Sequence, residues 1–199
     1  MTWGSNEWDD RYAQAAAANA SVWSLEPNAW IAATVGTLDP GSAVDLGAGE
    51  GRNALWLASL GWEVTAVDFS SVGLATGASR AASLGLDIEW VTADATTWVS
   101  PEEVDLVVAA YLQLPADQVA LALGNAVGYL APGGTLSVIG HDVDNLPRGV
   151  GGPQDPAVLY TVDALLEIAR DLDVIECRQY ERLTPKGTAI DAILVAVNR

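Results

Sequence analysis

The sequence has few residues of the kinds that bind metals or form disulfides. Its 199 residues include one cysteine, Cys177, and one histidine, His141. A single cysteine cannot form an internal disulfide, and the cysteine and histidine spacings typical of metal sites are missing. Cys177 lies in the strand-like stretch "DVIECRQY" with no histidine near it in the sequence, which favours a buried, inert thiol over a nucleophile. We therefore expect no metal centre.

Positive charge is also scarce. Nine Lys and Arg residues stand against 26 Asp and Glu residues, which gives a formal net charge of −17. Such a chain repels nucleic acid and anionic membranes at long range, so we expect neither as a partner. Solubility or adaptation to salt explains the same acidity without any partner, and the sharper alternative is a preference for small or cationic ligands.

Long apolar runs and a targeting signal are missing as well. No apolar run approaches the length of a membrane span, and the first ten residues, "MTWGSNEWDD", lack the basic region and apolar core of a signal peptide. We expect a cytoplasmic protein, monomeric or homodimeric. Half of the residues are hydrophobic, which suits one domain over 1–199, with a helical cap over 1–27 and a mobile Gly/Pro-rich loop over 145–156.

What the sequence does contain is a regular alternation of strand-like and helix-like segments, typical of the α/β class. Strand–helix repetition of this kind predicts a parallel, doubly wound sheet. Two extended segments near the C-terminus, joined by "TPKG", predict an antiparallel pair. The expected strands are 42–47, 62–70, 87–94, 104–111, 135–142, 173–183 and 188–198, and the expected helices include 28–38 with Asn28 as its cap, 52–61, 71–85, 116–130 and one from about Thr161.

The stretch "VDLGAGEG" joins the first predicted strand to a helix through Gly47, Gly49 and Gly51. Ligands of open α/β sheets bind outside the carboxyl ends of the strands. The dinucleotide fingerprint G-x-G-x-x-G places pyrophosphate at the helix N-terminus, but the spacing here is one residue shorter. Glu50 in the loop and Asp45 before it would repel a phosphate by about 1 kcal/mol at 4 Å in water, and more in a partly dry cleft. A cationic adenosyl ligand without phosphate, S-adenosylmethionine, fits better.

Two acids end the next two predicted strands. Asp68 can accept both hydrogen bonds of a ribose diol, or it caps the strand end or the next helix. Asp94 can bind an adenine amino group or form an Asx turn with Thr96. Arg52 opens a helix, where the macrodipole disfavours a cation by about 0.3–1 kcal/mol. Its expected partner is Glu50, Asp45 or the carboxylate of the cofactor's methionine moiety.

At these residues the chain resembles the class I S-adenosylmethionine-dependent methyltransferases. The stretches "VDLGAGEG", "VTAVDFS", "ADATTW", "VDLVVAAYLQLP" and "LAPGGTLSVIGHD" resemble five family motifs, in order and spacing, over about residues 40–142. More narrowly, "GEGRNALWLASLGWEVTAVDFS" is similar to bacterial methyltransferases of the tellurite-resistance and thiopurine type.

The resemblance implies a Rossmann-like sheet of seven mostly parallel strands with an antiparallel C-terminal strand, and S-adenosyl-L-methionine as the cofactor. It also implies a set of cofactor-binding residues: Asp45, Gly47, Ala48, Gly49, Gly51, Arg52, Asn53, Asp68, Phe69, Ser70, Asp94, Ala95 and Ala110.

The acceptor side has fewer signals. Trp8, Tyr12 and Trp23 precede the core, and they either form a lid over the sulfonium, because an aromatic face attracts a cation, or dock the N-terminal helix. Arg148, in the Gly/Pro-rich loop, is the expected contact for an anionic substrate.

Three residues at strand ends are candidates for catalysis. His141 follows the fifth predicted strand and can accept a proton from a substrate nucleophile, although a lone histidine is more often structural. Asp142 and Tyr111 lie at neighbouring strand ends and are weaker candidates for the same role.

We therefore expect methyl transfer to a small-molecule acceptor, with a thiol, an oxyanion or a similar soft nucleophile favoured. Two alternatives stay open: a noncatalytic S-adenosylmethionine-binding or sensor protein, and a nicotinamide-dependent oxidoreductase.

Overall fold

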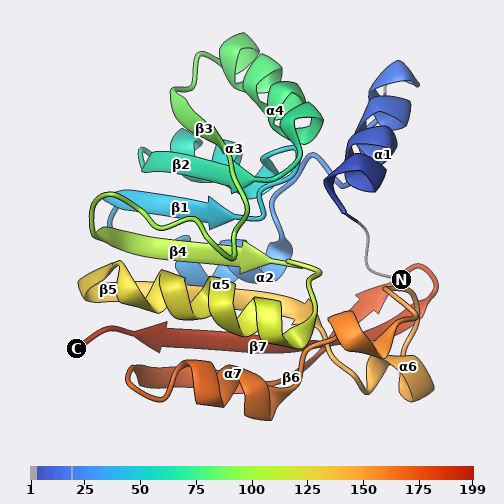
Figure 1. Ribbon diagram of the computed structural model, residues 1–199, viewed down its shortest axis with the longest axis vertical. Coiled ribbons are helices and arrows are strands. Elements are labelled where there is room, and N and C mark those ends of the chain that lie inside the picture. The colour runs from blue at the N-terminus through green and yellow to red at the C-terminus, as the bar shows by residue number, and fades with distance from the viewer. Residues whose placement is uncertain (1–3, 19) are drawn as a thin grey trace.

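Seven strands of the described residues form one sheet in the computed structural model, which describes residues 4–18 and 20–199 (Figure 1). Their order is β3-β2-β1-β4-β5-β7-β6. β7 runs antiparallel to both of its neighbours, and the other pairs are parallel. The strands are β1 (Ser42–Leu46), β2 (Glu63–Asp68), β3 (Ile88–Thr92), β4 (Val104–Ala110), β5 (Leu130–His141), β6 (Asp173–Thr184) and β7 (Gly187–Val197).

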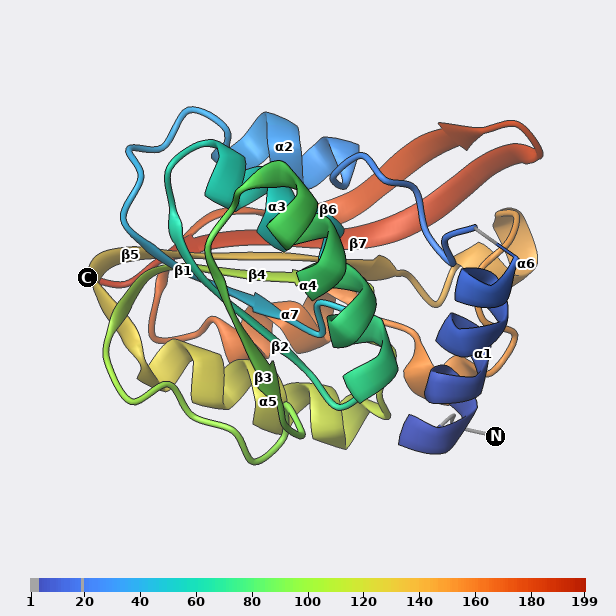
Figure 2. The same ribbon diagram turned by 90° about the horizontal axis from the view of Figure 1, so that it is seen from above.

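This architecture confirms the predicted α/β class and the mostly parallel sheet with an antiparallel C-terminal strand. Helices cover both faces of the sheet (Figures 1 and 2). On one face α2, α3 and α4 contribute buried side chains such as Ile31, Leu57 and Leu74. On the other, α5 and α7 contribute Leu123 and Leu165. The helices are α1 (Ser5–Ala17), α2 (Ala29–Val35), α3 (Arg52–Ser59), α4 (Ser71–Leu84), α5 (Ala116–Gly128), α6 (Asn145–Arg148), α7 (Val162–Ile168) and a 3-10 turn, η1 (Pro156–Val158).

The helix boundaries follow local capping chemistry. The Asn28 side chain accepts hydrogen bonds from the N–H groups of Trp30 and Ile31, so it caps α2 as predicted. The Thr161 side chain caps α7 in the same way. Gly85 ends α4 with a φ of 68°, a left-handed conformation that favours glycine.

The segment 145–156 differs from the irregular loop predicted for it. It begins with the short helix α6, and Asn145 is buried. The Asn145 side chain donates to the carbonyl of Gly151 and accepts from the N–H of Ile190 in β7. The Gly/Pro-rich composition does not predict these contacts, because both are made by the side chain of a single residue, Asn145.

Asp45 lies at the end of β1, buried between the sheet and α3. Its Oδ2 accepts a hydrogen bond of 3.0 Å from the N–H of Ala54, in the first turn of α3. This bond satisfies one of the N–H groups that have no partner within a helix. Burial raises the pKa of Asp45 from 3.8 to about 7.

The raised pKa of Asp45 predicts a specific effect of pH on stability. Between about pH 4 and pH 7 the unfolded chain loses a proton that the folded chain keeps, so stability from this group is full below pH 4 and is lost as the pH rises through 7. Asp45→Asn is neutral at every pH and still accepts from Ala54. The wild type loses stability between about pH 5 and about pH 8, and the variant does not. We therefore expect the difference in unfolding free energy, variant minus wild type, to increase by about 1–3 kcal/mol over this range. Urea denaturation at several pH values measures this, with the exposed Glu63→Gln in β2 as the control. A difference that stays constant with pH would contradict the assignment.

Candidate functional site

A cleft lies at the carboxyl ends of β1, β2 and β4, between the glycine loop and α1, which sits beyond these strand ends (Figures 1 and 2). The free space in it is only about 50 Å³. Seven of the predicted cofactor residues line the cleft: Gly47, Ala48, Arg52, Asn53, Asp68, Phe69 and Ala110. So do Trp8, Tyr12, Trp23 and Tyr111, together with Leu112, Gln113 and Leu114, which the sequence analysis did not name. The sequence thus identified most of the cleft lining.

Asp68, at the end of β2, ties the glycine loop to the sheet. Its Oδ2 accepts from the N–H of Gly49 at 2.8 Å, and its Oδ1 accepts from the N–H of Ser70 at 2.8 Å. Burial raises the pKa of Asp68, and these two hydrogen bonds oppose the rise. Asp68 therefore lines the cleft and also binds one of the loop N–H groups.

Glu50 does not face the cleft. The carboxylate is buried, and its Oε2 accepts from the N–H groups of Val22 at 2.9 Å and Trp23 at 3.4 Å. Its Oε1 lies 3.3 Å from Nη2 of Arg80. Gly49 and Gly51, on either side of it, both have positive φ values and turn the loop at this point. The expectation that Glu50 repels a ligand phosphate is therefore wrong, since its charge holds the N-terminal segment instead.

Arg52 has neither of the protein carboxylates expected as its partners within hydrogen-bonding distance. Its Nη1 donates to Oγ of Ser24 at 3.1 Å, and its guanidinium carbon lies 6.0 Å from the ring centroid of Trp23. Because Arg52 lines the cleft, its remaining donors can serve a ligand carboxylate.

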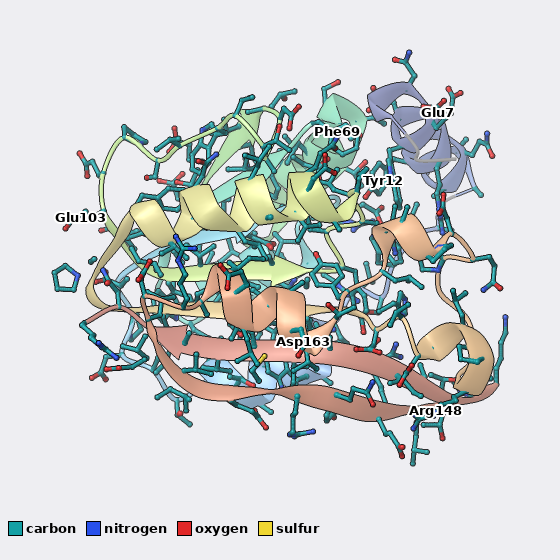
Figure 3. All side chains as sticks on the ribbon, turned by 60° about the horizontal axis from the view of Figure 1, so that its bottom comes forward. Glu7, Tyr12, Phe69, Glu103, Arg148 and Asp163 are labelled. Carbon is teal, nitrogen blue, oxygen red and sulfur yellow. The ribbon has the colours of Figure 1, made fainter. Side chains whose placement is uncertain are left out.

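Three aromatic residues cover the glycine loop. Trp8 stacks on Tyr12 with ring centroids 5.7 Å apart and lies 5.9 Å from Trp23, and Nε1 of Trp23 donates to Oη of Tyr12 at 3.3 Å. A Cβ atom at Gly49 would come within 2.5 Å of the Tyr12 hydroxyl, so only glycine permits this approach. Figure 3 shows Tyr12 and Phe69 on the same side of the molecule. The aromatic residues therefore dock α1 on the loop and wall the cleft at once.

The other predicted cofactor residues do not line the cleft. Asp45 is buried behind the loop, as described above, and Gly49 is covered by Tyr12. Ser70 caps α4, Gly51 packs against Trp90, and Ala95 is buried in the core. Asp94 is exposed and forms the Asx turn with Thr96, the alternative to an adenine contact.

A second cavity, of about 450 Å³, adjoins the cleft. It shares Trp8, Trp23 and Gln113 with the cleft, and adds Arg11 and His141. Residues from Gly152 to Val158 form the rest of its wall. Two of the predicted lid residues, Trp8 and Trp23, thus meet His141 around one space, which lies next to the predicted cofactor residues.

His141 and Tyr111 belong to a polar cluster whose centre the sequence analysis missed. The centre is Asp191 in β7, which is 0% exposed. The Tyr111 hydroxyl donates to Asp191 Oδ2 at 2.9 Å, and Arg182 Nε donates to the same oxygen at 2.8 Å. His141 Nδ1 lies 3.0 Å from Asp191 Oδ1. The one available signal was a charged residue inside the apolar run "TAIDAILVAV".

Two predicted substrate-side residues lie away from both cavities. Asp142 is buried, and its Oδ1 accepts from the N–H of Asp144 and from Nε2 of Gln179. Arg148 is exposed in α6 and pairs with Asp144 at 3.0 Å. Figure 3 shows Arg148 far from Tyr12 and Phe69. The structure brings neither residue to the cleft.

Two further observations concern the residues that the structure describes. None of their helices has the length and apolar character needed to cross a membrane. No group of three or more of their His, Cys, Asp and Glu side chains is arranged to hold a metal ion. Cys177 is half-buried, and burial raises the pKa of its thiol.

Comparison with known sequences agrees with the geometry. Residues 43–134 match a family model described as a methyltransferase domain. The chain is 33% identical over 180 residues to trans-aconitate 2-methyltransferase of Methylobacterium radiotolerans. The match covers 83% of this chain and 64% of that protein. It is 31% identical over 120 residues to hemagglutinin 1 of Eikenella corrodens, covering 59% of this chain and 40% of that protein. The chain therefore spans less than two thirds of the length of these relatives.

Solved structures share the fold. TehB from Haemophilus influenzae superposes with a TM-score of 0.75 at 20% identity, covering 87% of this chain and 63% of that one. The N-methyltransferase NodS from Bradyrhizobium japonicum, in complex with S-adenosyl-L-homocysteine, gives a TM-score of 0.67 at 19% identity, covering 95% and 86%. The motif matches, the sheet order and the family model together confirm the resemblance to class I S-adenosylmethionine-dependent methyltransferases, and residues 43–134 are the part that matches the methyltransferase domain model.

Proposed function

We propose that the protein transfers a methyl group from S-adenosylmethionine to a small-molecule acceptor. The observation that supports this proposal is that two N–H groups at the strand-to-helix turn already have acceptors. The N–H of Gly49 donates to Asp68, and the N–H of Ala54 in α3 donates to Asp45. A dinucleotide-binding loop gives such N–H groups to pyrophosphate. Here a phosphate would compete with two carboxylates, which supports a phosphate-free ligand over a nicotinamide dinucleotide.

The cleft residues fit the parts of that cofactor. Asp68 retains lone pairs for ribose hydroxyls, Phe69 and Ala110 offer apolar surface for adenine, and Arg52 offers donors to a carboxylate. The Trp8 and Trp23 rings already attract a cation, since the guanidinium carbon of Arg11 lies 5.2 and 5.3 Å from their centroids, and a sulfonium can make the same kind of contact. When bound, the cofactor supplies a methyl group activated by the positive charge on sulfur, so the protein supplies position and exclusion of water.

The second cavity suits the acceptor. Its volume of about 450 Å³ lies within the range of small-molecule sites, which is about 300–1,000 Å³. The trans-aconitate 2-methyltransferase relative is consistent with a small acceptor. A thiolate or another soft anion reacts without a base, whereas a hydroxyl or an amine needs one, and His141 is the candidate on the cavity wall.

The free space of about 50 Å³ in the first cleft is far below that range, so the N-terminal segment has to move before a cofactor binds. Glu50 attaches this segment at the N–H groups of Val22 and Trp23, and Asp9 of α1 accepts a hydrogen bond from the Ser70 hydroxyl. The ligand-binding step is therefore coupled to a local opening of residues around α1.

Replacing Asp68 tests the cofactor assignment. We expect Asp68→Asn to weaken S-adenosylmethionine binding by about 10–100-fold, since hydrogen bonds to a charged group contribute about 1.5–3 kcal/mol. Isothermal titration calorimetry measures this. The control is Asp105→Asn, because Asp105 is exposed near the amino end of β4, whereas the cleft lies at the carboxyl ends of the strands. Tighter binding of NAD than of S-adenosylmethionine by the wild type would overturn the proposal.

Turnover separates an enzyme from a sensor. The wild type is incubated with S-adenosylmethionine and a panel of thiols, phenols, amines and carboxylates, and S-adenosylhomocysteine is quantified. Formation of product with one class supports the proposal. Tight cofactor binding without product across the panel would favour the noncatalytic sensor.

The attachment at Glu50 makes a second prediction. In Glu50→Ala the N–H groups of Val22 and Trp23 lose a charged acceptor, so we expect their hydrogen exchange to accelerate by about 10–100-fold. Exchange measured by NMR resolves these amides. Glu26→Ala, which removes an exposed carboxylate from the same segment, is the matched control. Unchanged protection at Val22 in Glu50→Ala would show that other contacts hold the segment.

A further inference from the structure

We propose that Asp191 is a positioning residue for His141, and that the acceptor accordingly loses a proton as it is methylated. This inference rests on the proposed function. It narrows the acceptor to a molecule that arrives protonated on its attacking atom, such as a phenol, and excludes one that arrives ionised, such as a carboxylate.

Asp191 is built to stay ionised although it is fully buried. Its Oδ2 accepts from the Tyr111 hydroxyl at 2.9 Å and from Arg182 Nε at 2.8 Å. Burial opposes ionisation, but the contacts with His141 and Arg182 hold the pKa of Asp191 below its usual range. Burial also raises the pKa of Tyr111 above its ordinary value, so this hydroxyl remains a donor. A buried carboxylate is stable only when paired and hydrogen-bonded in this way.

The arrangement leaves one carboxylate oxygen for the histidine. With both donors on Oδ2, Oδ1 faces His141 Nδ1 at 3.0 Å. The two atoms are within reach of each other, but their geometry is not that of a hydrogen bond. Such misalignment is common in catalytic pairs before the substrate binds.

The opposite side of the His141 ring, which carries Nε2, lies at the proposed acceptor cavity. His141 ends β5, and the antiparallel pairing places it directly opposite Asp191 in β7. Its Nε2 and Cδ2 lie against Gly152, which lines the second cavity, and a Cβ at Gly152 would come within 2.9–3.1 Å of these ring atoms. The Tyr111 ring, 4.7 Å away, packs on the imidazole.

Together these contacts favour one tautomer of the neutral His141 ring. A carboxylate facing Nδ1 favours a proton on that nitrogen and leaves the Nε2 lone pair free toward the cavity, which is the state a general base requires. Tyr111 has a φ of 61°, a left-handed backbone conformation that is unusual for a bulky residue. Backbone strain of this kind is typical of functional sites.

The proton balance identifies the acceptor class. The attacking atom of the acceptor gains the methyl group and releases its proton to Nε2 of His141, while the electron pair of the broken carbon–sulfur bond stays on sulfur. The positive charge lost by the sulfonium reappears on the imidazole, next to the Asp191 carboxylate. An acceptor that is already ionised has no proton to release, so it would not need His141 as a base or Asp191 to position it.

The tautomer can be read directly, because His141 is the only histidine in the chain. In uniformly ¹⁵N-labelled protein, long-range ¹H–¹⁵N spectra recorded over a range of pH identify the neutral ring and separate its two tautomers. We expect a proton on Nδ1 in the wild type. A proton on Nε2 would overturn the proposal, and this measurement needs no variant that has to fold.

Two variants extend the test. Asp191→Asn removes the charge at the centre of the cluster, and Glu181→Gln removes an exposed carboxylate from β6 as the control. We expect Asp191→Asn to abolish the Nδ1–H preference and Glu181→Gln to retain it. Should Asp191→Asn unfold, Arg182→Gln, which removes only one donor, replaces it with a partial loss of the preference. A preference unchanged in a folded Asp191→Asn protein would refute the role.

Binding and turnover separate this inference from the proposed function. Asp191 does not line the cofactor cleft, so S-adenosylmethionine affinity in Asp191→Asn should stay within about twofold of the wild type. With a phenolic acceptor we expect kcat to fall by at least about 100-fold with little change in KM. Equal turnover of phenols by both proteins, or turnover of carboxylates alone by the wild type, would refute the acceptor class. Absence of cofactor binding in the wild type would instead refute the proposed function.

Discussion

Every tight turn between a strand and a helix leaves backbone N–H groups that need an acceptor, and here two buried carboxylates meet that need. Asp45 and Asp68 end adjacent strands and accept from Ala54 and Gly49. These two bonds fix the glycine loop and the first turn of α3 to the sheet, and they bear on which ligand the cleft can accept. Since these two N–H groups are already satisfied, the cleft offers the carboxylate of Asp68 and the guanidinium of Arg52 where a dinucleotide site would offer bare amides.

The loop in turn supports the N-terminal segment. Glu50 leaves the ligand side of the loop and binds the backbone at Val22 and Trp23, while glycine at position 49 allows Tyr12 to pack directly on the backbone. The same few residues therefore shape the cleft and close it. In the proposed function, closure of this kind would exclude water from the reaction and would require local opening before the cofactor binds, which couples the stability of the α1 region to ligand binding.

The acceptor side depends on the antiparallel last strand. In β7 the chain returns beside β5, and its register sets Asp191 opposite His141. The adjacent strand β6 brings Arg182, and the end of β4 brings Tyr111. Residues that are between 9 and 80 positions from Asp191 in the sequence form one polar cluster. Its buried charge is stabilised by two donors on Oδ2, the Tyr111 hydroxyl and Nε of Arg182.

The sequence by itself determined the α/β class, the order of the strands, the helix cap at Asn28, the start of a helix near Thr161, and most of the residues that line the cleft. Those features are written in short-range patterns, because periodicity, capping and a glycine turn act within a few residues. Only the tertiary structure decided the direction of Glu50, the buried anchor Asn145 in a segment that reads as loop, the placement of Asp142 and Arg148 away from the cleft, and the central role of Asp191. Each of these depends on a partner distant in sequence, and a side chain's partner across a sheet is set by strand register and packing, which no local pattern encodes.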